Sequence, residues 1–366
     1  MTENKGLFVL LNEIVQKYIK DYFEVKSGTF EENAPSDIFL GAGTKELINE
    51  VLAVDIKISI YGIDGSSRSL TSSGGIISIS TLAISSSYSS IYGVFPSLFG
   101  LPVLPINKPF IGLASSNPSR GKIEPFLYSS NSLFTSVSLS GEPFLSTHDP
   151  ERIESEIRGV LETEALKITK NKGITIIDGP LFPSYIYLPD KVKGILTKER
   201  SKVIDQNYIG VVKRLDKSNL LVKVLSKNSK EFENKYGINP KNFLSDESFL
   251  YHLVRFNYSP PYPILSIGPL IKEIEKIKYY IYYLVLPYHK YVSKFSVLRI
   301  ESMNRDAVNI VSSLAFSGDG IPKILAIADK TAKELSSGIL KYIIFSLNRI
   351  GFQESFRDKF EVYNVV

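Results

Sequence analysis

The chain has 366 residues, of which 43% are hydrophobic and 11% aromatic, so a substantial core is possible and wholesale disorder is excluded. At about 150 residues per domain, this length predicts two domains or one elaborated core. The net charge of +5 permits nucleic-acid binding without requiring it, and the absence of cysteine excludes disulfides, thiolate nucleophiles and iron–sulfur sites. The composition, rich in Ile, Lys and Tyr, is typical of the intracellular proteins of thermophiles.

Residues 1–54 are predicted to form an N-terminal helical segment. Its first helix carries an apolar stripe, and a short second helix is expected near residues 45–53. Charged residues interrupt the first helix at every turn, which disfavours a signal peptide. The most apolar later stretch, Tyr279–Pro287, is about half the length that a membrane-spanning helix needs. We therefore expect a soluble, cytoplasmic protein without membrane contact.

The main domain is predicted over residues 55–350, with insertions near 96–131 and 227–275 and a C-terminal tail at 351–366. Alternating apolar residues from Lys57 predict a strand that stops at the turn dipeptide Asp64-Gly65. Further strands are expected at 75–85 and 89–95, which together with the first would form an antiparallel meander. Another strand is expected near 132–140.

A regular alternation of helices and strands follows. Asp149 and Pro150 begin a predicted helix to about Lys170, and the apolar run at 173–178 is typical of a buried strand parallel to the first. We then expect a helix at 189–206, a strand at 208–215, a short helix after residue 218, a hairpin at 279–301 and a final helix at 322–349, with a buried stripe at Leu335, Ile339, Ile343 and Leu347. The predicted fold class is α/β, a mixed sheet flanked by helices in the element order of ribonuclease H-like folds.

Four acidic residues have placements that suggest a metal site. Asp64 and Asp178 follow apolar strands, Glu162 lies midway along the helix before the second of these strands, and Asp329 lies in the first half of the final helix. Carboxylates at neighbouring strand ends repel one another unless a hard cation such as Mg²⁺ or Mn²⁺ joins them. Two such ions support phosphodiester hydrolysis.

Each of these acids also has a structural interpretation. The Asp-Gly pairs at Asp64 and Asp178 are common turn dipeptides. Glu162 is one of five acids between residues 151 and 164, and Glu164 competes with it as the ligand. Asp329 is spaced to pair with Lys333 on an exposed helix face.

Five short motifs in order resemble the NurA nuclease family over roughly residues 55–350. They are Tyr61-Gly-Ile-Asp64-Gly-Ser-Ser-Arg68, Ile174-Thr-Ile-Ile-Asp178-Gly-Pro-Leu181, Gly210-Val-Val-Lys213, Val297-Leu-Arg299-Ile-Glu301 and Gly320-Ile-Pro322-Lys-Ile-Leu-Ala-Ile-Ala-Asp329.

The resemblance implies a ribonuclease H-like, Mn²⁺- or Mg²⁺-dependent DNA nuclease that binds two ions. Family members are homodimers that partner a HerA-type hexameric ATPase and process DNA ends in archaea, as 5′–3′ exonucleases and single-strand endonucleases. The metal-binding acids would be Asp64, Glu162 and Asp178. Where the family usually has Tyr and His, this chain has Ile321 and Asp329, and Asp329 would serve as a fourth, carboxylate ligand.

Basic residues in or beside these motifs are candidates for binding DNA phosphates: Arg68, Lys213, Arg299 and Lys330. The alternative interpretation is that they are ordinary surface cations surrounded by water. Two functions therefore stay open: an active metal-dependent nuclease, favoured by the acids, and an inactive scaffold or adaptor beside a DNA translocase, favoured by the missing Tyr and His.

Overall fold

The computed structural model describes residues 38–41, 46–51, 54–72, 74–97, 100–116, 133–183 and 187–349. Within these ranges the strands form one mixed sheet in the order β1-β10-β11-β12-β9-β8-β3-β4-β6-β7, with β2 paired to β10 and β5 to β4. The strands are β1 (Ile38–Leu40), β2 (Ile48–Glu50), β3 (Ile60–Ser72), β4 (Gly75–Ser86), β5 (Gly93–Phe95), β6 (Ile111–Ser115), β7 (Phe134–Thr135), β8 (Ile174–Asp178), β9 (Tyr208–Val212), β10 (Leu265–Ile274), β11 (Ile277–His289) and β12 (Val292–Ser302).

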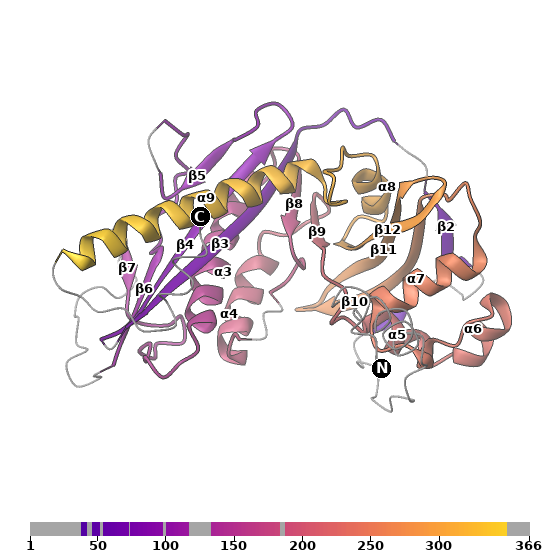
Figure 1. The fold of residues 1–366 in the computed structure, drawn as a ribbon, viewed down its shortest axis with the longest axis horizontal. Helices are drawn as coiled ribbons and strands as arrows, with labels where there is room; N and C mark the ends of the chain where they lie inside the picture. Colours follow the sequence, from indigo (N-terminus) through magenta and orange to yellow (C-terminus); the bar gives the residue numbers. More distant parts are fainter. Residues whose placement is uncertain are drawn as a thin grey trace, which may run out of the picture.

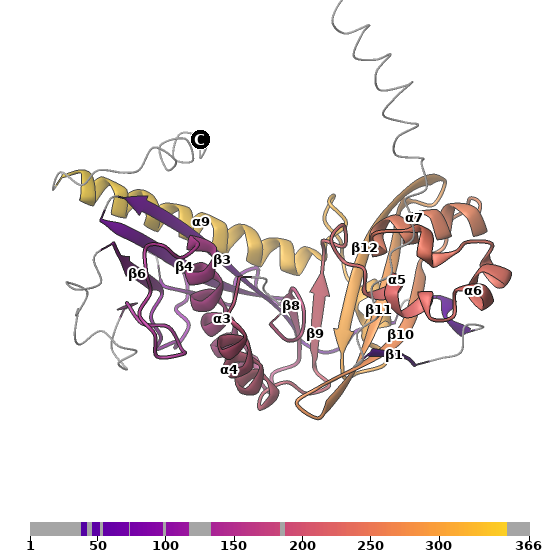
Figure 2. The ribbon, with the colours of Figure 1, turned by 90° about the horizontal axis from the view of Figure 1, so that it is seen from below.

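Helices cover both faces of this sheet. They are α3 (Pro150–Thr169), α4 (Asp190–Ser201), α5 (Leu220–Ser226), α6 (Ser229–Tyr236), the 3-10 helix η3 (Pro240–Asn242), α7 (Asp246–Asn257), α8 (Ala307–Ser312) and α9 (Lys323–Asn348). Helix α9 runs along one face of β3 and β4, while α3 and α4 lie on the opposite face (Figures 1 and 2). None of the helices in this part of the chain has the length and apolar composition of a membrane-spanning segment.

The central strands are apolar on both faces because both faces are covered. In β8, Ile177 packs into the core on the α3 side, whereas Ile176 packs with Leu325 of α9. This double burial accounts for the near-continuous apolar run that the sequence shows there. Strand β8 pairs in parallel with β3 and β9, and β3 pairs antiparallel with β4, so the predicted mixed sheet flanked by helices is confirmed.

Several predicted elements agree with the structure. Asp149 caps α3 by accepting a hydrogen bond from the Glu151 amide, and α9 begins directly after Pro322. The strands at 75–86 and 174–178, the short helix α5 and the hairpin β11–β12 also lie where the sequence predicts them. These segments have strong periodicity or a clear capping residue.

Four predictions about the elements are wrong. Strand β3 does not end at Asp64-Gly65 but continues to Ser72, because its ladder with β4 continues and serine pairs bridge the strands at Ser67–Ser80 and Ser69–Ser78. Residues 48–50 form strand β2 rather than a helix, since β10 supplies a partner strand. Strands β6 and β10 of the sheet lie in the two segments, near 96–131 and 227–275, that were interpreted as insertions.

The fourth correction concerns the buried face of α9. Leu335 is buried as predicted, and Ile339 and Ile343 are half-buried against the core. Ile344, outside the predicted stripe, is buried, and Leu347 is only half-buried. The last turns of α9 extend beyond the β3–β4 ladder in Figure 2, so less of the helix is covered there. The predicted N-terminal helix and the tail at 351–366 lie outside the described residues.

Candidate metal centre

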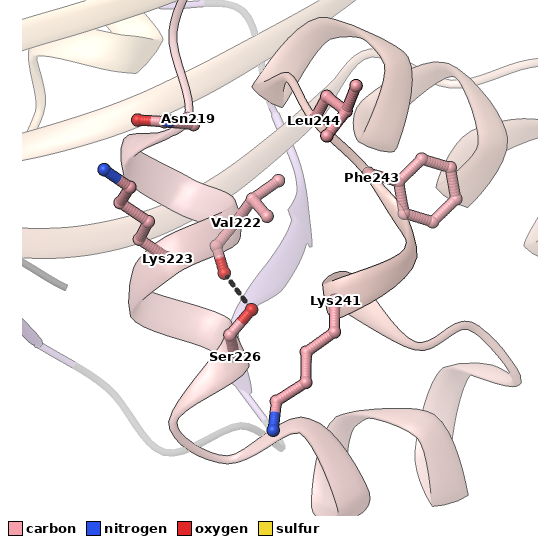
Figure 3. Close-up of a pocket in the computed structure, with 7 residues that line it drawn as sticks. All are labelled: Asn219, Val222, Lys223, Ser226, Lys241, Phe243 and Leu244. Carbon is pink, nitrogen blue, oxygen red and sulfur yellow. Dashed lines mark hydrogen bonds between the residues drawn. The ribbon is translucent and has the colours of Figure 1, made fainter. Parts of the chain in front are cut away.

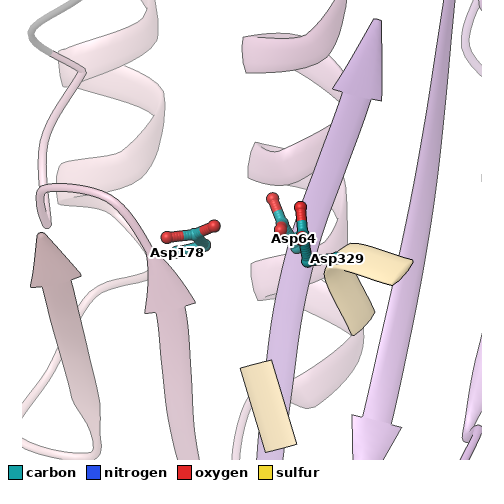
Figure 4. A group of neighbouring side chains, drawn as sticks. All are labelled: Asp64, Asp178 and Asp329. Carbon is teal, nitrogen blue, oxygen red and sulfur yellow. The ribbon is translucent and has the colours of Figure 1, made fainter. Parts of the chain in front are cut away.

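Three aspartates from three separate elements meet at one point of the sheet. Asp64 lies in β3, Asp178 is the last residue of β8, and Asp329 lies in α9. One carboxylate oxygen from each lies within 4.8 Å of the other two. In Figure 4 the Asp64 and Asp329 side chains lie together and Asp178 extends toward them from the neighbouring strand. The predicted proximity of Asp64 and Asp178 is therefore present in the structure.

The strand register places the first two carboxylates side by side. Strands β3 and β8 pair in parallel as far as Ile63 and Ile177, so Asp64 and Asp178 are the next residues on adjacent strands. Since side chains alternate along a strand, both point to the same face. This face is the one that α9 covers, because a methyl group on Gly62 would lie 2.9 Å from the Ile324 carbonyl oxygen of α9.

Small and hydroxylated residues of β4 hold α9 in the position that brings in Asp329. The Ser85 hydroxyl donates to the Ile324 carbonyl at 2.6 Å, and the Thr81 hydroxyl donates to the Ala332 carbonyl at 2.7 Å. These two bonds flank Asp329 on either side along the helix. They fix the helix along its axis, so the Asp329 carboxylate lies beside that of Asp64.

The cluster has more negative charge than its neighbours neutralise. Asp64 is only 6% exposed, and its Oδ2 atom has no hydrogen-bond partner. Burial, followed by the nearby Asp178 carboxylate, raises the pKa of Asp64 well above its usual value. An acid in this situation is held protonated at higher pH than usual, or binds a cation that compensates its charge.

Two lysines provide part of the compensation. Lys213 Nζ contacts Asp178 Oδ2 at 2.5 Å, and Lys333 Nζ contacts Asp329 Oδ2 at 2.8 Å. Burial lowers the pKa of Lys213, but the carboxylates of the cluster outweigh it and raise that pKa, so the amine stays charged. Burial also works against ionisation of Asp329, yet the Lys333 bond and further contacts lower its pKa. Asp329 thus takes part in the cluster and in the pair with Lys333.

Glu162 is not part of this cluster. Its carboxylate is buried on the opposite face of the sheet, where it pairs with Arg200 at 2.8 Å and with Arg158 at 3.7 Å. A methyl group on Gly65, the residue after Asp64, would lie 3.1 Å from Glu162 Oε1, so the glutamate packs against the strand from behind. The sequence interpretation grouped it with the aspartates because it could not identify Arg200 as a partner. The competing Glu164 pairs with Lys167 at 2.8 Å.

The four predicted phosphate-binding residues have different environments. Lys213 lies in the cluster itself. Arg68 is half-buried on the same β3 face as Asp64, and its Nε atom has no hydrogen-bond partner. Lys330 is 77% exposed beside Glu334. Arg299, by contrast, is half-buried, with 14% of its side chain exposed, and its guanidinium group is already paired with Glu301 at 2.9 Å.

Three residues with hydrogen bonds to segments beside the cluster escaped the sequence interpretation. Thr81 and Ser85 fix α9, but a Ser/Thr-rich strand gives no indication of which helix carbonyl it will bind. Glu301 was noted only within its motif; in the structure its Oε2 accepts a hydrogen bond from the Leu181 amide, three residues after Asp178.

A small cavity of 60 Å³ lies elsewhere, between α5 and the segment after η3 (Figure 3). No residue of the aspartate cluster lines it. Its lining is Asn219, Val222, Lys223, Ser226, Lys241, Phe243 and Leu244.

Comparison with known proteins places this site in a family. The family model for the NurA domain matches residues 58–334, a stretch that contains all three aspartates. No curated protein sequence is similar enough to count as a match. Among solved structures, the NurA nuclease from Sulfolobus solfataricus aligns over 94% of this chain and 98% of its own, with 12% identity and a TM-score of 0.51. A structure of NurA with manganese aligns over 92% and 98% at 9% identity, with a TM-score of 0.46. The match of the family model across most of the chain shows that this protein belongs to the NurA nuclease family.

Proposed function

We propose that this protein is a divalent-metal-dependent deoxyribonuclease that hydrolyses phosphodiester bonds at the Asp64–Asp178–Asp329 cluster. The observation that carries the proposal is the unpartnered Oδ2 atom of Asp64, buried among two further carboxylates. A protein gains nothing in stability from such an arrangement, because buried charge without compensation is costly. The arrangement is instead suited to a cation that joins the three side chains.

The donor atoms fit a hard cation. All three ligands are carboxylate oxygens, without sulfur or imidazole among them, and this set suits Mg²⁺ or Mn²⁺. Asp64, Asp178 and Asp329 would hold the metal, with two ions as the family resemblance implies. When bound, the metal supplies an activated water and charge stabilisation at the phosphate. Glu162, predicted from the sequence as a further ligand, pairs with Arg200 on the opposite face and is not among the residues that we propose to hold the metal.

The protein's own residues orient the substrate around this centre. Lys213 holds Asp178 through its 2.5 Å contact and brings a positive charge to the rim of the cluster, where an incoming phosphate would need one. Because its amine contacts Asp178 Oδ2, it also holds that carboxylate in place. Arg68 lies further along the same face of β3. We propose that it binds a backbone phosphate of the DNA strand that is cleaved at the cluster.

The finer assignments rest on the family. We propose a ribonuclease H-like core, 5′–3′ exonuclease and single-strand endonuclease activity in cytoplasmic DNA-end processing, and a HerA-type hexameric ATPase as partner. We also propose a homodimer, the most frequent closed symmetry. Light scattering in solution should then give twice the chain mass of 40.9 kDa; a monomer at micromolar concentration would contradict the dimer.

A second candidate function is a scaffold or adaptor without strong catalytic activity. The observation that favours it is Ile321, which packs among apolar residues next to α9 where the family usually has a tyrosine. An isoleucine has no hydroxyl group to offer a substrate.

The test is digestion of single-stranded and linear duplex DNA with Mn²⁺ or with EDTA. We expect cleavage of DNA only with the metal, and its loss in Asp178→Asn. Binding of DNA without cleavage under every metal condition would favour the adaptor instead.

A further inference from the structure

The segment directly after Asp178 is held from the opposite face of the sheet. Strand β8 ends at Asp178, and Gly179 turns the chain with a φ of 109°. The Gly179 amide donates to the Val211 carbonyl at 2.9 Å, and the Leu181 amide donates to Glu301 Oε2 at 3.0 Å. The orientation of Asp178 therefore depends on two anchors within the next three residues.

Glu301 is itself fixed by a buried network. It is 4% exposed, and its second oxygen, Oε1, accepts from Arg299 Nε at 2.9 Å. Arg299 Nη1 donates to the Ser218 hydroxyl at 3.1 Å, and that hydroxyl donates to Asp246 Oδ2 at 2.6 Å. A carboxylate bound at both oxygens in a dry environment has one orientation available to it.

The far end of the network is equally satisfied. Asp246 is fully buried, and it accepts further hydrogen bonds from the Val222 amide at 3.1 Å and from the Tyr283 hydroxyl at 2.8 Å. The network thus joins α5, α7, β11 and β12 to the segment that follows Asp178.

Gly210 makes the approach of this segment possible. It lies directly across from Glu301 in the β9–β12 register. A methyl group at this position would lie 2.6 Å from the Leu181 nitrogen and 2.9 Å from the Gly179 carbonyl oxygen. Both atoms belong to the backbone, so any side chain at 210 would push the segment away from Glu301.

From these contacts we infer that Glu301 is a positioning residue for the metal centre: it fixes the 179–181 segment and thereby the orientation of the Asp178 carboxylate. This inference rests on the proposed function. Glu301 does not contact the three aspartates; it acts through Leu181 and the backbone. Outer partners that orient a metal ligand typically contribute about tenfold to a hundredfold in metal affinity.

Two variants disturb the same segment in different ways, and a third serves as the control. Glu301→Gln leaves only one carbonyl oxygen for two donors, and Gly210→Ala pushes the segment by steric contact. The matched control, Tyr283→Phe, removes one hydrogen bond at the other end of the network without touching the segment. All three are compared as full-length protein by thermal unfolding.

The readouts are the Mn²⁺ dissociation constant without DNA, measured by calorimetry, and hydrogen exchange of the Leu181 amide in the metal-free protein. We expect Glu301→Gln and Gly210→Ala to weaken Mn²⁺ binding by about tenfold or more and to accelerate exchange at Leu181. Tyr283→Phe should lower thermal stability with an unchanged Mn²⁺ affinity. Cleavage by the first two variants should recover largely at saturating Mn²⁺.

Unchanged Mn²⁺ affinity in Glu301→Gln and Gly210→Ala would overturn the inference and leave the network a structural one. A wild-type protein that binds Mn²⁺ but cleaves no DNA would overturn the proposed nuclease function, while the affinities would still decide the role of Glu301. If Glu301→Gln does not fold, Gly210→Ala decides.

Discussion

Acidic residues lie on both faces of the central sheet, but their partners differ sharply. On the opposite face from α9, each acid has its partners. Glu162 binds Arg200, and Glu301 binds Arg299 and the Leu181 amide. Asp246 accepts three hydrogen bonds from side chains and backbone. On the α9 face, three aspartates share one place, two lysines each contact one of them, and one oxygen of Asp64 has no partner.

The difference shows how a structural carboxylate is distinguished from a candidate functional one. A buried acid that stabilises the fold has its charge and both of its oxygens satisfied. In the aspartate cluster, Asp64 is buried but one of its oxygens has no hydrogen-bond partner. Buried acids that are not fully satisfied are expected at functional sites. Four predictions sharpen or break this comparison.

The largest effect is expected from Asp178→Asn. The substitution removes a carboxylate from the cluster, so Mn²⁺-dependent cleavage should fall by at least about a thousandfold, the scale of losing a major catalytic contribution. The affinity for DNA without metal should barely change, since no phosphate contact is removed. Cleavage assays and fluorescence anisotropy measure the two quantities. Retention of most of the cleavage rate would separate the cluster from catalysis.

On the opposite face, Arg200→Met should mainly affect stability. Arg200 is 1% exposed, and its loss leaves Glu162 with a buried, poorly compensated charge. Breaking such a pair typically costs about 3–5 kcal/mol in the free energy of unfolding. Urea denaturation in EDTA gives this value. A cost below about 1 kcal/mol, as for surface pairs, would remove the contrast between the two faces.

Asp64→Asn should change the free energy of unfolding, measured by urea denaturation in EDTA, in the opposite direction to Arg200→Met. Without metal, the buried Asp64 carboxylate is destabilising at neutral pH because burial raises its pKa, so the neutral amide should raise the free energy of unfolding. Added Mn²⁺ should stabilise the wild type and stabilise the variant much less. A variant less stable than the wild type in EDTA would place Asp64 among the structural carboxylates.

A smaller effect is expected from Thr81→Val. The valine keeps the shape of the side chain but loses the bond to the Ala332 carbonyl, at a cost of about 1 kcal/mol. Because this bond helps to place Asp329, the Mn²⁺ concentration for half-maximal cleavage should rise severalfold. Phe232→Leu, in α6, is a control that lowers stability away from the cluster. An equal rise in both variants would argue against a specific role for Thr81.

The sequence predicts much of this arrangement because some of its signals are local. The Asp149 cap and the apolar run before Asp178 define α3 and β8, and adjacent parallel strands bring Asp64 close to Asp178. The length of β3 could not be predicted, since Asp64-Gly65 is locally a turn signal and only pairing with β4 overrides it. The pairing of Glu162 with Arg200 bridges 38 residues, so no spacing in the sequence indicates it.

Arg299 illustrates the same limit. A basic residue in a strand motif is equally compatible with a phosphate contact and with a buried ion pair. The choice depends on Glu301, Ser218 and the helices that cover them, which come together only in the folded chain.

The most direct test of the central claim is Mn²⁺ binding by the metal-free protein as a function of pH. Because the pKa of Asp64 is raised, the folded protein keeps a proton above the usual aspartate pKa of 3.8, and its stability falls as pH rises through that window. Mn²⁺ must displace this proton. Calorimetry in buffers of different ionisation enthalpy should therefore detect proton release and an affinity that rises with pH, both lost in Asp64→Asn. Binding that is independent of pH and unchanged in Asp64→Asn would contradict a metal centre at the three aspartates.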